Sequence, residues 1–334
     1  MSISNLIEIA GLALGIKRMN ITVVLCTHNR CESLTKALDS VAASTLPNSV
    51  EWEVLVIDNN SSDRTRDVVE DSCCRHPGRF RYVFEPRQGK SNALNAGVRE
   101  ARGDILAFMD DDVTVEPTWL QNLTAALHNG EWAGSGGRTL PAQAFTPPRW
   151  LALDGPYSMG GMLYAHFDLG DNSRQLDRAP YGTNMSFRKE MFEKHGGFRT
   201  DLGPGPSREI PRFNEDTEFG RRLLAAGERL RYEPSAVVYH VVPQERIRKE
   251  YFLSWWFDYG RSTIREVGKR PDILGIPRYY FSIPKGIAGT LLVTLQWMLA
   301  LNPQRRFFLK ALVWYMTGQI VEIYRRSRCK EKER

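Results

Sequence analysis

The first 137 residues alternate between short apolar, β-rich runs and stretches with helical spacing, and this alternation constrains the fold more than any other feature. The apolar runs predict strands at Ile21–Thr27, Trp52–Asp58, Phe80–Glu85 and Asp104–Asp110. The stretches between them predict helices at Cys31–Ser44, Asp63–Arg75 and Ser91–Ala101. Strands that are apolar on both faces and alternate with helices indicate an α/β protein with a doubly wound, mainly parallel sheet.

Polar residues follow three of these predicted strands. They lie at Thr27 to Arg30, at Asp58 to Asn60 and at Asp110 to Asp112. Right-handed crossovers place the carboxyl ends of parallel strands at one edge of the sheet, where ligands bind in doubly wound folds. The sequence therefore predicts one polar site built from segments that are far apart in the chain.

Three consecutive carboxylates end the fourth predicted strand. If the chain stays extended there, Asp110 and Asp112 project to the same side. Two carboxylates held close together repel each other unless a positive group lies beside them. Mg²⁺ or Mn²⁺ that also binds a diphosphate meets this need, because both ions prefer carboxylate and phosphate oxygens. The alternative is a polar loop whose carboxylates cap a helix near Pro117.

Further carboxylates have both structural and chemical interpretations. Asp58 can accept hydrogen bonds from a nucleobase or ribose, although Ser62 or Asp63 in the same run can instead cap the next helix. A second candidate pair, Glu215 and Asp216, opens a predicted helix that ends at Gly227. Acids suit the first turn of a helix, but a carboxylate there can also deprotonate a hydroxyl group.

The segment from residue 236 to 248 contains a histidine and two arginines, and each of them has two possible interpretations. His240 lies in the strand-like run Ala236–Val242, where it is either a core histidine or a ligand. Arg246 and Arg248 follow shortly after. They either clamp a diphosphate through paired N–H groups or lie on a solvated helix face.

Two aromatic segments are expected to shape a ligand pocket. Residues 138–180 are rich in Pro, Gly and aromatic residues and show little periodicity, which predicts a long loop region. Structure is expected to resume near Tyr181–Phe187. An amphipathic helix at Glu245–Val267 contains Trp255, whose face suits a sugar ring or a lipid carrier.

Seven short motifs, in the same order, resemble those of family 2 glycosyltransferases, which have the GT-A fold. They are Val23 to Arg30, Val56 to Asp63, Gly89 to Gly97, Phe108 to Asp112, Gly182 to Met185, Asn214 to Asp216, and Tyr239 with His240. The resemblance covers residues 19–260. One such motif has low specificity, whereas seven in order are specific.

The resemblance implies an inverting, metal-dependent enzyme that moves a sugar from a nucleoside-diphosphate sugar, expected to be a UDP-sugar, to a saccharide or lipid-linked acceptor. It places this reaction in the synthesis of cell-surface or extracellular polysaccharide. It implies that Asp216 is the general base that deprotonates the acceptor hydroxyl. Asp112 would ligate Mn²⁺ or Mg²⁺, with His240 as a second and less uniform ligand.

The resemblance implies the residues of the donor site, whereas the residue types described above point to those of a second region. The donor nucleotide would contact Thr27, Asn29, Arg30, Asp58, Lys90, Asp110 and Asp111. The acceptor or diphosphate region would contain Asn184, Glu215, Arg246 and Trp255. The chain departs from the Gln-x-x-Arg-Trp motif of processive synthases, and this departure favours transfer of a single sugar.

Other functions fit the sequence less well. A nucleotide-sugar pyrophosphorylase would have a Gly-rich basic loop after the first strand, where this chain has Cys26 to Arg30. A dinucleotide oxidoreductase would have a G-x-G-x-x-G motif there. A non-catalytic, membrane-associated module that binds nucleotide sugars remains an alternative, although Asp110, Asp112 and Asp216 are all present.

The net charge of +6 is located in one segment. Residues 302–334 contain nine Lys or Arg and three Glu, while the other 36 basic and 36 acidic residues balance. A neutral body with a basic tail argues against nucleic-acid binding, which needs a basic face on the domain itself. The tail suits either an anionic membrane surface or solvent.

The C-terminal region also contains an apolar stretch, Ile287–Leu301, of 15 residues. A spanning helix needs about 20. With Phe307–Tyr324, this stretch predicts a hairpin at 281–324 that lies in the membrane interface, or else a buried helix pair. The five cysteines form no C-x-x-C pair, which argues against a secreted disulfide framework. Glu8 interrupts the apolar stretch near the N-terminus, which argues against a signal peptide. We therefore expect a cytoplasmic location, at the membrane face.

The expected organisation has three parts. Residues 1–18 form an N-terminal extension. Residues 19–243 form the GT-A catalytic domain, with a nucleotide-binding half at 19–137 and an acceptor half at 138–243. Residues 244–334 form a helical C-terminal region that ends in the basic tail.

Overall fold

A computed structural model describes residues 19–207, 209–267 and 279–332. The expected N-terminal extension at 1–18 and the last two residues of the basic tail lie outside the described residues.

The sheet begins with four parallel strands. Their order is β3 (Phe80–Phe84), β2 (Val50–Asp58), β1 (Met19–Thr27) and β4 (Ile105–Asp110). The connecting helices are α2 (Cys31–Ala42), α3 (Thr65–Arg75) and α4 (Lys90–Glu100). The predicted alternation is therefore confirmed, with boundaries shifted by one or two residues. Thr27 pairs with Asp58, and Cys26 pairs with Asp110, so the polar strand ends meet at one edge.

Beyond β4 the sheet becomes mixed. Strand β8 (Met185–Arg188) runs antiparallel to both β4 and β6 (Gly134–Pro141), and β6 pairs in parallel with β9 (Leu230–His240). Strand β9 also pairs with β5 (Val113–Val115) and the short β7 (Arg174–Gln175). This order places β9, which ends in His240, within reach of the strand ends of the parallel half.

Strand β6 and the elements after it replace part of the predicted loop at 138–180. These elements are η1 (Gly155–Tyr157), α6 (Gly160–Tyr164) and β7. Strand β6 is rich in glycine and therefore shows no side-chain periodicity. Packing against β9 requires a glycine at position 137, because a Cβ atom there would lie 2.2 Å from the carbonyl oxygen of Ala236.

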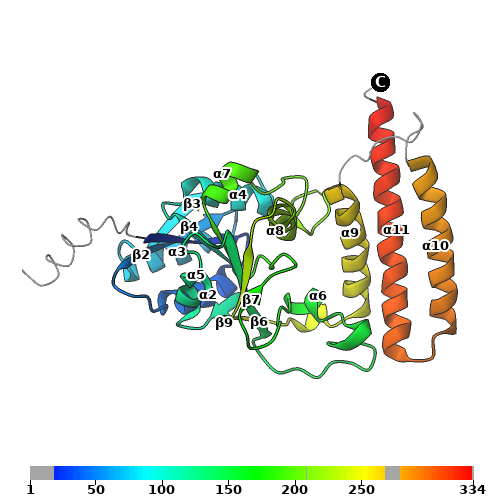
Figure 1. The fold of residues 1–334 in the computed structure, drawn as a ribbon, viewed down its shortest axis with the longest axis horizontal. Coiled ribbons are helices and arrows are strands. Elements are labelled where there is room, and N and C mark those ends of the chain that lie inside the picture. Colours follow the sequence, from blue (N-terminus) through cyan, green and yellow to red (C-terminus); the bar gives the residue numbers. More distant parts are fainter. Residues whose placement is uncertain (1–18, 208, 268–278, 333–334) are drawn as a thin grey trace, which may run out of the picture.

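Alternate residues of the parallel strands pack on opposite faces of the sheet. Val23 and Leu25 of β1 join a core with α2, α3 and α5 (Trp119–Ala125). Val24 joins the other core, which contains α4, α7 (Glu190–His195) and α8 (Glu215–Ala225). Helices cover both faces, as the predicted apolar runs require (Figure 1).

The C-terminal region consists of η2 (Gln244–Arg246), α9 (Lys249–Val267), α10 (Tyr279–Leu299) and α11 (Pro303–Lys332). Helix α11 lies between α9 and α10, beside the sheet domain (Figure 1). Helices α9 and α11 approach closely at two glycines, since a Cβ atom on Gly260 or Gly318 would lie 2.0 Å from a backbone oxygen of the other helix. Helices α10 and α11 form the expected hairpin.

Helix α10 has an apolar outer face. Its exposed side chains include Ile287, Leu291, Leu292, Leu295, Met298 and Leu299. Within the described ranges, no helix has both the length and the hydropathy that crossing a bilayer requires.

Candidate active site

A cavity of about 900 Å³ opens at the carboxyl ends of β1 and β4. Eleven of the predicted site residues line it: Thr27, Arg30, Lys90, Asp110, Asp111, Asp112, Glu215, Asp216, His240, Arg246 and Trp255. They come from both halves of the sheet and from the C-terminal region. The fold thus gathers residues that are more than 200 positions apart, Thr27 and Trp255 among them.

Asp111 binds two other residues of the cavity wall, Thr27 and Arg30. It is buried, and it accepts a hydrogen bond from the hydroxyl of Thr27 at 2.8 Å and one from Arg30 at 2.9 Å. Burial raises the pKa of Asp111 to about 6, and Asp112 adds to this rise while Arg30 opposes it. Asp111 therefore fixes the direction of Arg30. The guanidinium group of Arg30 also contacts Asp112 at 3.1 Å.

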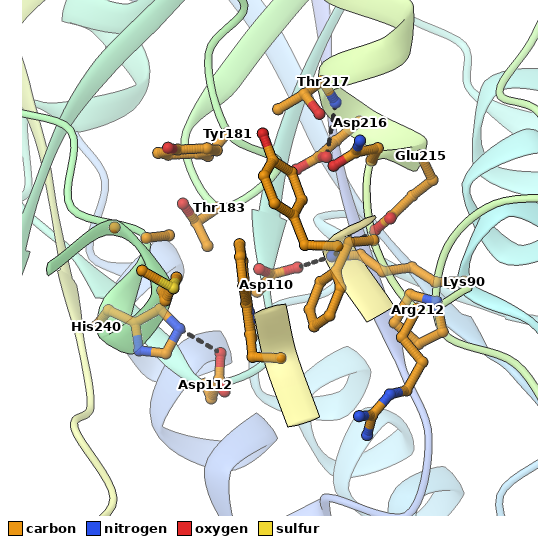
Figure 2. Close-up of a pocket in the computed structure, with 18 of the residues that line it drawn as sticks. Lys90, Asp110, Asp112, Tyr181, Thr183, Arg212, Glu215, Asp216, Thr217 and His240 are labelled. Atoms are coloured by element: carbon orange, nitrogen blue, oxygen red, sulfur yellow. Dashed lines mark hydrogen bonds and ion pairs between the residues drawn. The ribbon is translucent and has the colours of Figure 1, made fainter. Parts of the chain in front are cut away.

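Asp112 lies among three basic side chains. Besides Arg30, Arg246 contacts it at 3.4 Å, and the Nε2 atom of His240 lies 3.5 Å from its other oxygen. The chain turns after β4 and does not stay extended, yet both Asp110 and Asp112 line the cavity. Figure 2 shows Asp112 and His240 together on one side of it.

The donor atoms of Asp112 and His240 fit a divalent cation. The Nδ1 atom of His240 lies 2.7 Å from the carbonyl oxygen of Val241, which can only accept, so Nδ1 carries the hydrogen. In the neutral ring, Nε2 then presents a lone pair toward the carboxylate of Asp112. No cluster of three or more potential ligand side chains occurs among the described residues. Further ligands of a cation would therefore come from the nucleotide or from water.

Lys90 lines the cavity and lies between two acids. Its ammonium group contacts Asp110 at 2.7 Å and Glu215 at 3.5 Å. Burial alone would lower the pKa of Lys90, but the charges of Asp110, Glu215 and Asp216 outweigh it and raise this pKa well above its usual range. Lys90 in turn holds the pKa of Asp110 below its ordinary value, against the effect of burial.

Glu215 and Asp216 begin α8 and point in different directions (Figure 2). The residue before them, Asn214, has a left-handed backbone with φ of 75°. One carboxylate oxygen of Asp216 accepts the backbone N–H of Gly182 and the other that of Thr217, both at 2.6 Å. Burial, reinforced by the charge of Asp216 and opposed by Lys90, raises the pKa of Glu215 to about 7.

Three predicted site residues are absent from the described residues that line the cavity. Asn29 hydrogen-bonds Ser62 at 2.7 Å and joins two loops. Asp58 is buried and accepts hydrogen bonds from the backbone of Ser61 and the hydroxyl of Tyr82, both at 2.8 Å. Its carboxylate oxygens therefore already have partners within the protein.

Asn184 differs most from its predicted role in the acceptor region. Its amide accepts a hydrogen bond from the indole of Trp119 and donates to the carbonyl oxygens of Arg138 and Ala236. It is buried and joins α5 to strands β6 and β9. The structure thus gives Asn184 a packing role outside the residues that line the cavity, and its acceptor role stays a prediction.

Several residues that line the cavity were not among the site residues predicted from the sequence. They include His28, Asn59, Tyr181, Thr183, Arg212 and Tyr259. His28, Asn59, Tyr181 and Thr183 lie within or beside motifs that the sequence already marked. Arg212 lies in a segment without periodicity, and nothing in its sequence context distinguishes it.

The chain is similar to known glycosyltransferases. The family model described as "Glycosyl transferase family 2" matches residues 22–196. The succinoglycan biosynthesis protein ExoM of Rhizobium meliloti is 29% identical over 256 residues, which cover 75% of this chain and 76% of that protein. The glucosyl-dolichyl phosphate glucuronosyltransferase of Haloferax volcanii is 27% identical over 251 residues, covering 74% and 77% of the two chains.

Solved structures of glycosyltransferases share the fold. The mannosyltransferase PcManGT from Pyrobaculum calidifontis, in complex with GDP-Man and Mn²⁺, superposes with a TM-score of 0.61 at 19% identity, covering 91% of this chain and 87% of that one. GalNAc-T7 with UDP, GalNAc and Mn²⁺ gives 0.54 at 16% identity, covering 74% and 51%. Because the family model spans more than half of the chain, and the fold agrees, this protein belongs to glycosyltransferase family 2.

Proposed function

We propose that this glycosyltransferase moves one sugar, with inversion and with the help of a divalent cation, from a nucleoside-diphosphate sugar to an acceptor hydroxyl. The observation that carries the proposal is the composition of a single cavity. A carboxylate and a histidine nitrogen meet on one side of it, and Asp216 lies on the other (Figure 2). One side is suited to a diphosphate and the other to an acceptor.

The diphosphate would lie between the basic side chains of the cavity. Arg30 and Arg246 both contact Asp112, and Lys90 contacts Asp110, so these cations are held in place before a ligand binds. Such preorganised charges stabilise the negative charge that develops on the departing diphosphate. Mn²⁺ or Mg²⁺ held by Asp112 and His240 would supply Lewis-acid stabilisation of the same charge. The neighbours bound to Mn²⁺ support this cofactor.

Asp216 is the proposed general base. Its two oxygens each accept one backbone N–H, which fixes the carboxylate but leaves lone pairs for an incoming hydroxyl. A positioned base of this kind contributes about 10²- to 10⁴-fold to the rate. Glu215 is the weaker candidate because its carboxylate already contacts the ammonium group of Lys90 at 3.5 Å.

For the donor we propose a UDP-sugar, and for the acceptor a saccharide or a lipid-linked saccharide used in polysaccharide synthesis. ExoM is named for succinoglycan biosynthesis, and the Haloferax relative is named for a dolichyl phosphate acceptor. The aromatic side chains of Trp255 and Trp256 in the cavity wall are suited to sugar rings and to lipid carriers.

A peripheral membrane contact at the cytoplasmic face is also proposed. The apolar outer face of α10 supports it, because residues 286–304 contain no charged side chain while Lys285, Arg305 and Arg306 flank them. An apolar face with basic residues at its borders is suited to an anionic membrane surface.

Thermal-shift screening with UDP, GDP and their sugars, with and without Mn²⁺, tests the donor and the cofactor together. We expect the largest rise in melting temperature with UDP and Mn²⁺. Release of UDP from a UDP-sugar separates an enzyme from a non-catalytic binding module, since a pure binder releases none. Absence of any metal-dependent shift would contradict the proposal.

A further inference from the structure

A buried acid joins the C-terminal hairpin to α9. Glu322 of α11 is fully buried, and two arginines of α9 share its carboxylate. Arg261 contacts one oxygen at 3.2 Å, and Arg265 contacts the other at 2.5 Å. A buried ion pair seldom stabilises a protein more than apolar side chains of the same volume. Helix packing alone therefore does not account for these charges.

The same two arginines also hold a loop of the catalytic domain. We define the pocket loop as residues 201–214, of which residue 208 lies outside the described part. The guanidinium group of Arg261 donates to the carbonyl oxygen of Glu209 at 2.6 Å. Arg265 donates to the same oxygen at 3.1 Å and to that of Asp201 at 3.4 Å.

A second connection runs from Arg261 to the cavity. Asp258 of α9 contacts Arg261 at 3.2 Å and, through its other oxygen, Arg212 of the pocket loop at 2.6 Å. Arg212 lines the cavity, and Ser254 accepts a further hydrogen bond from it at 3.0 Å. Glu322, Arg261, Asp258 and Arg212 thus form a continuous chain of ion pairs from α11 to the cavity wall.

The pocket loop is part of the candidate active site. Pro204, Gly205 and Phe213 line the cavity, and the loop leads directly into Glu215 and Asp216. Its far side is fixed by the backbone N–H of Lys90, which donates to Pro204 at 2.8 Å. A change on the α9 side therefore shifts the loop relative to Lys90 and Asp216.

We propose that Glu322 is a positioning residue, which sets the place of the pocket loop through Arg261 and Arg265. Without its charge, both guanidinium groups lose the carboxylate that they share, which loosens their hold on the carbonyl oxygen of Glu209 and, through Asp258, on Arg212. The hairpin thereby contributes to the geometry of the active site. This consequence for catalysis rests on the proposed transfer reaction, whereas the structural link does not.

Amide hydrogen exchange of the full-length protein tests the link without any substrate. Glu322→Gln keeps the shape of the side chain and removes the charge. We expect exchange in peptides from 201–214 to rise by about tenfold or more, since local opening follows the loss of fixed hydrogen bonds. The matched control is Arg326→Met, because Arg326 also joins α11 to α9, at the carbonyl oxygen of Ile264, with no hydrogen bond to the described residues of the pocket loop. Its exchange at 201–214 should stay within about twofold of wild type.

Asp258→Asn provides an independent variant if Glu322→Gln does not fold. It interrupts the same chain of ion pairs at the contact with Arg212 and should raise exchange at 209–214. Equal exchange at 201–214 in Glu322→Gln and Arg326→Met would overturn the proposal, as would a rise spread evenly over the whole chain. Calorimetric binding of UDP with Mn²⁺ distinguishes the two proposals: if binding is absent in wild type, the proposed function fails, while the exchange result stands by itself.

Discussion

The Nε2 atom of His240 lies 3.5 Å from a carboxylate oxygen of Asp112, while its Nδ1 atom contacts the carbonyl oxygen of Val241. When the ring is neutral, Nε2 and the carboxylate are two acceptors that face each other, and a cation between or beside them stabilises the pair. The pair is formed by strand β9 and the turn after β4, which lie 128 residues apart in the sequence.

Asp112→Asn and His240→Ala are each expected to abolish the effect of Mn²⁺ on UDP binding. In the wild type, Mn²⁺ should strengthen UDP binding by about tenfold or more relative to EDTA, as measured by calorimetry. His166→Ala is the control, since His166 lines the same cavity without contacting Asp112 in any described interaction. Retention of the full Mn²⁺ effect in Asp112→Asn would refute the assignment.

Asp216→Asn should lower the rate of transfer by about 10²- to 10⁴-fold, because an amide cannot take the proton of the acceptor. UDP binding should stay within a few-fold of wild type. Glu218→Gln is a matched control on the same helix, where Glu218 pairs with Arg222 at 2.8 Å. A near-normal rate in Asp216→Asn would move the role of base to another group.

The pKa of Glu215 predicts a dependence of stability on pH. Burial and Asp216 raise this pKa from 4.5 to about 7, so the folded state binds the extra proton between these values. This contribution to stability is fully present below about pH 4.5 and is lost as the pH rises through 7. Glu215→Gln mimics the protonated form.

Denaturant unfolding at pH 5 and pH 8 measures this effect. From pH 5 to pH 8, the wild type should lose about 1–3 kcal/mol of its free energy of unfolding through Glu215. Glu215→Gln should not show this loss. Parallel pH profiles for variant and wild type would show that Glu215 is ionised throughout.

Asn184→Ala should lower the free energy of unfolding by about 2–3 kcal/mol, because it leaves the indole of Trp119 and two carbonyl groups without their partner. Asn122→Ala is the control, since Asn122 is a half-buried amide that hydrogen-bonds Ser235 near the surface. UDP binding should be unchanged in the folded Asn184→Ala protein. A selective loss of transfer without loss of stability would restore the predicted acceptor role.

Leu291→Lys combined with Leu295→Lys tests the outer face of α10. Burial of each leucine in a membrane stabilises the bound state by about 1.5–3 kcal/mol, so co-sedimentation with anionic vesicles should fall at least about tenfold. The added positive charge alone would strengthen binding to these vesicles. Gln296→Lys, at an exposed polar position of the same helix, serves as the control. Unchanged sedimentation of the double variant would exclude this face as the membrane contact.

The parallel half of the sheet was predictable because its signals are local. Each strand from β1 to β4 is a continuous apolar run, and each polar strand end follows from the topology of parallel sheets. Nine of the eleven predicted site residues that line the cavity come from the family motifs, and the other two are Arg246 and Trp255. The glycine-rich strand β6 was not predictable, because close packing against β9 determines it and leaves no periodic pattern.

Hydrogen bonds within the protein explain why two predicted site residues, Asp58 and Asn184, are not among the residues that line the cavity. Asp58 and Asn184 have the residue types of a binding site, and they stand in its motifs. Tyr82, however, donates a hydrogen bond to the carboxylate of Asp58. Trp119 donates one to the side-chain amide of Asn184, and these two residues lie 65 positions apart in the sequence. A sequence shows which side chains can form hydrogen bonds, but not which buried neighbour has already used them.

The sequence by itself determined the order of strands and helices in the first half of the chain and the chemical types gathered at the strand ends. The tertiary structure alone decided that His240 faces Asp112, that Lys90 lies between Asp110 and Glu215, and that Glu322 reaches the pocket loop through two arginines. The physical reason is range. Periodicity reports the burial of a residue within its own element, whereas charge pairing depends on which distant elements the closed fold brings within a few ångströms.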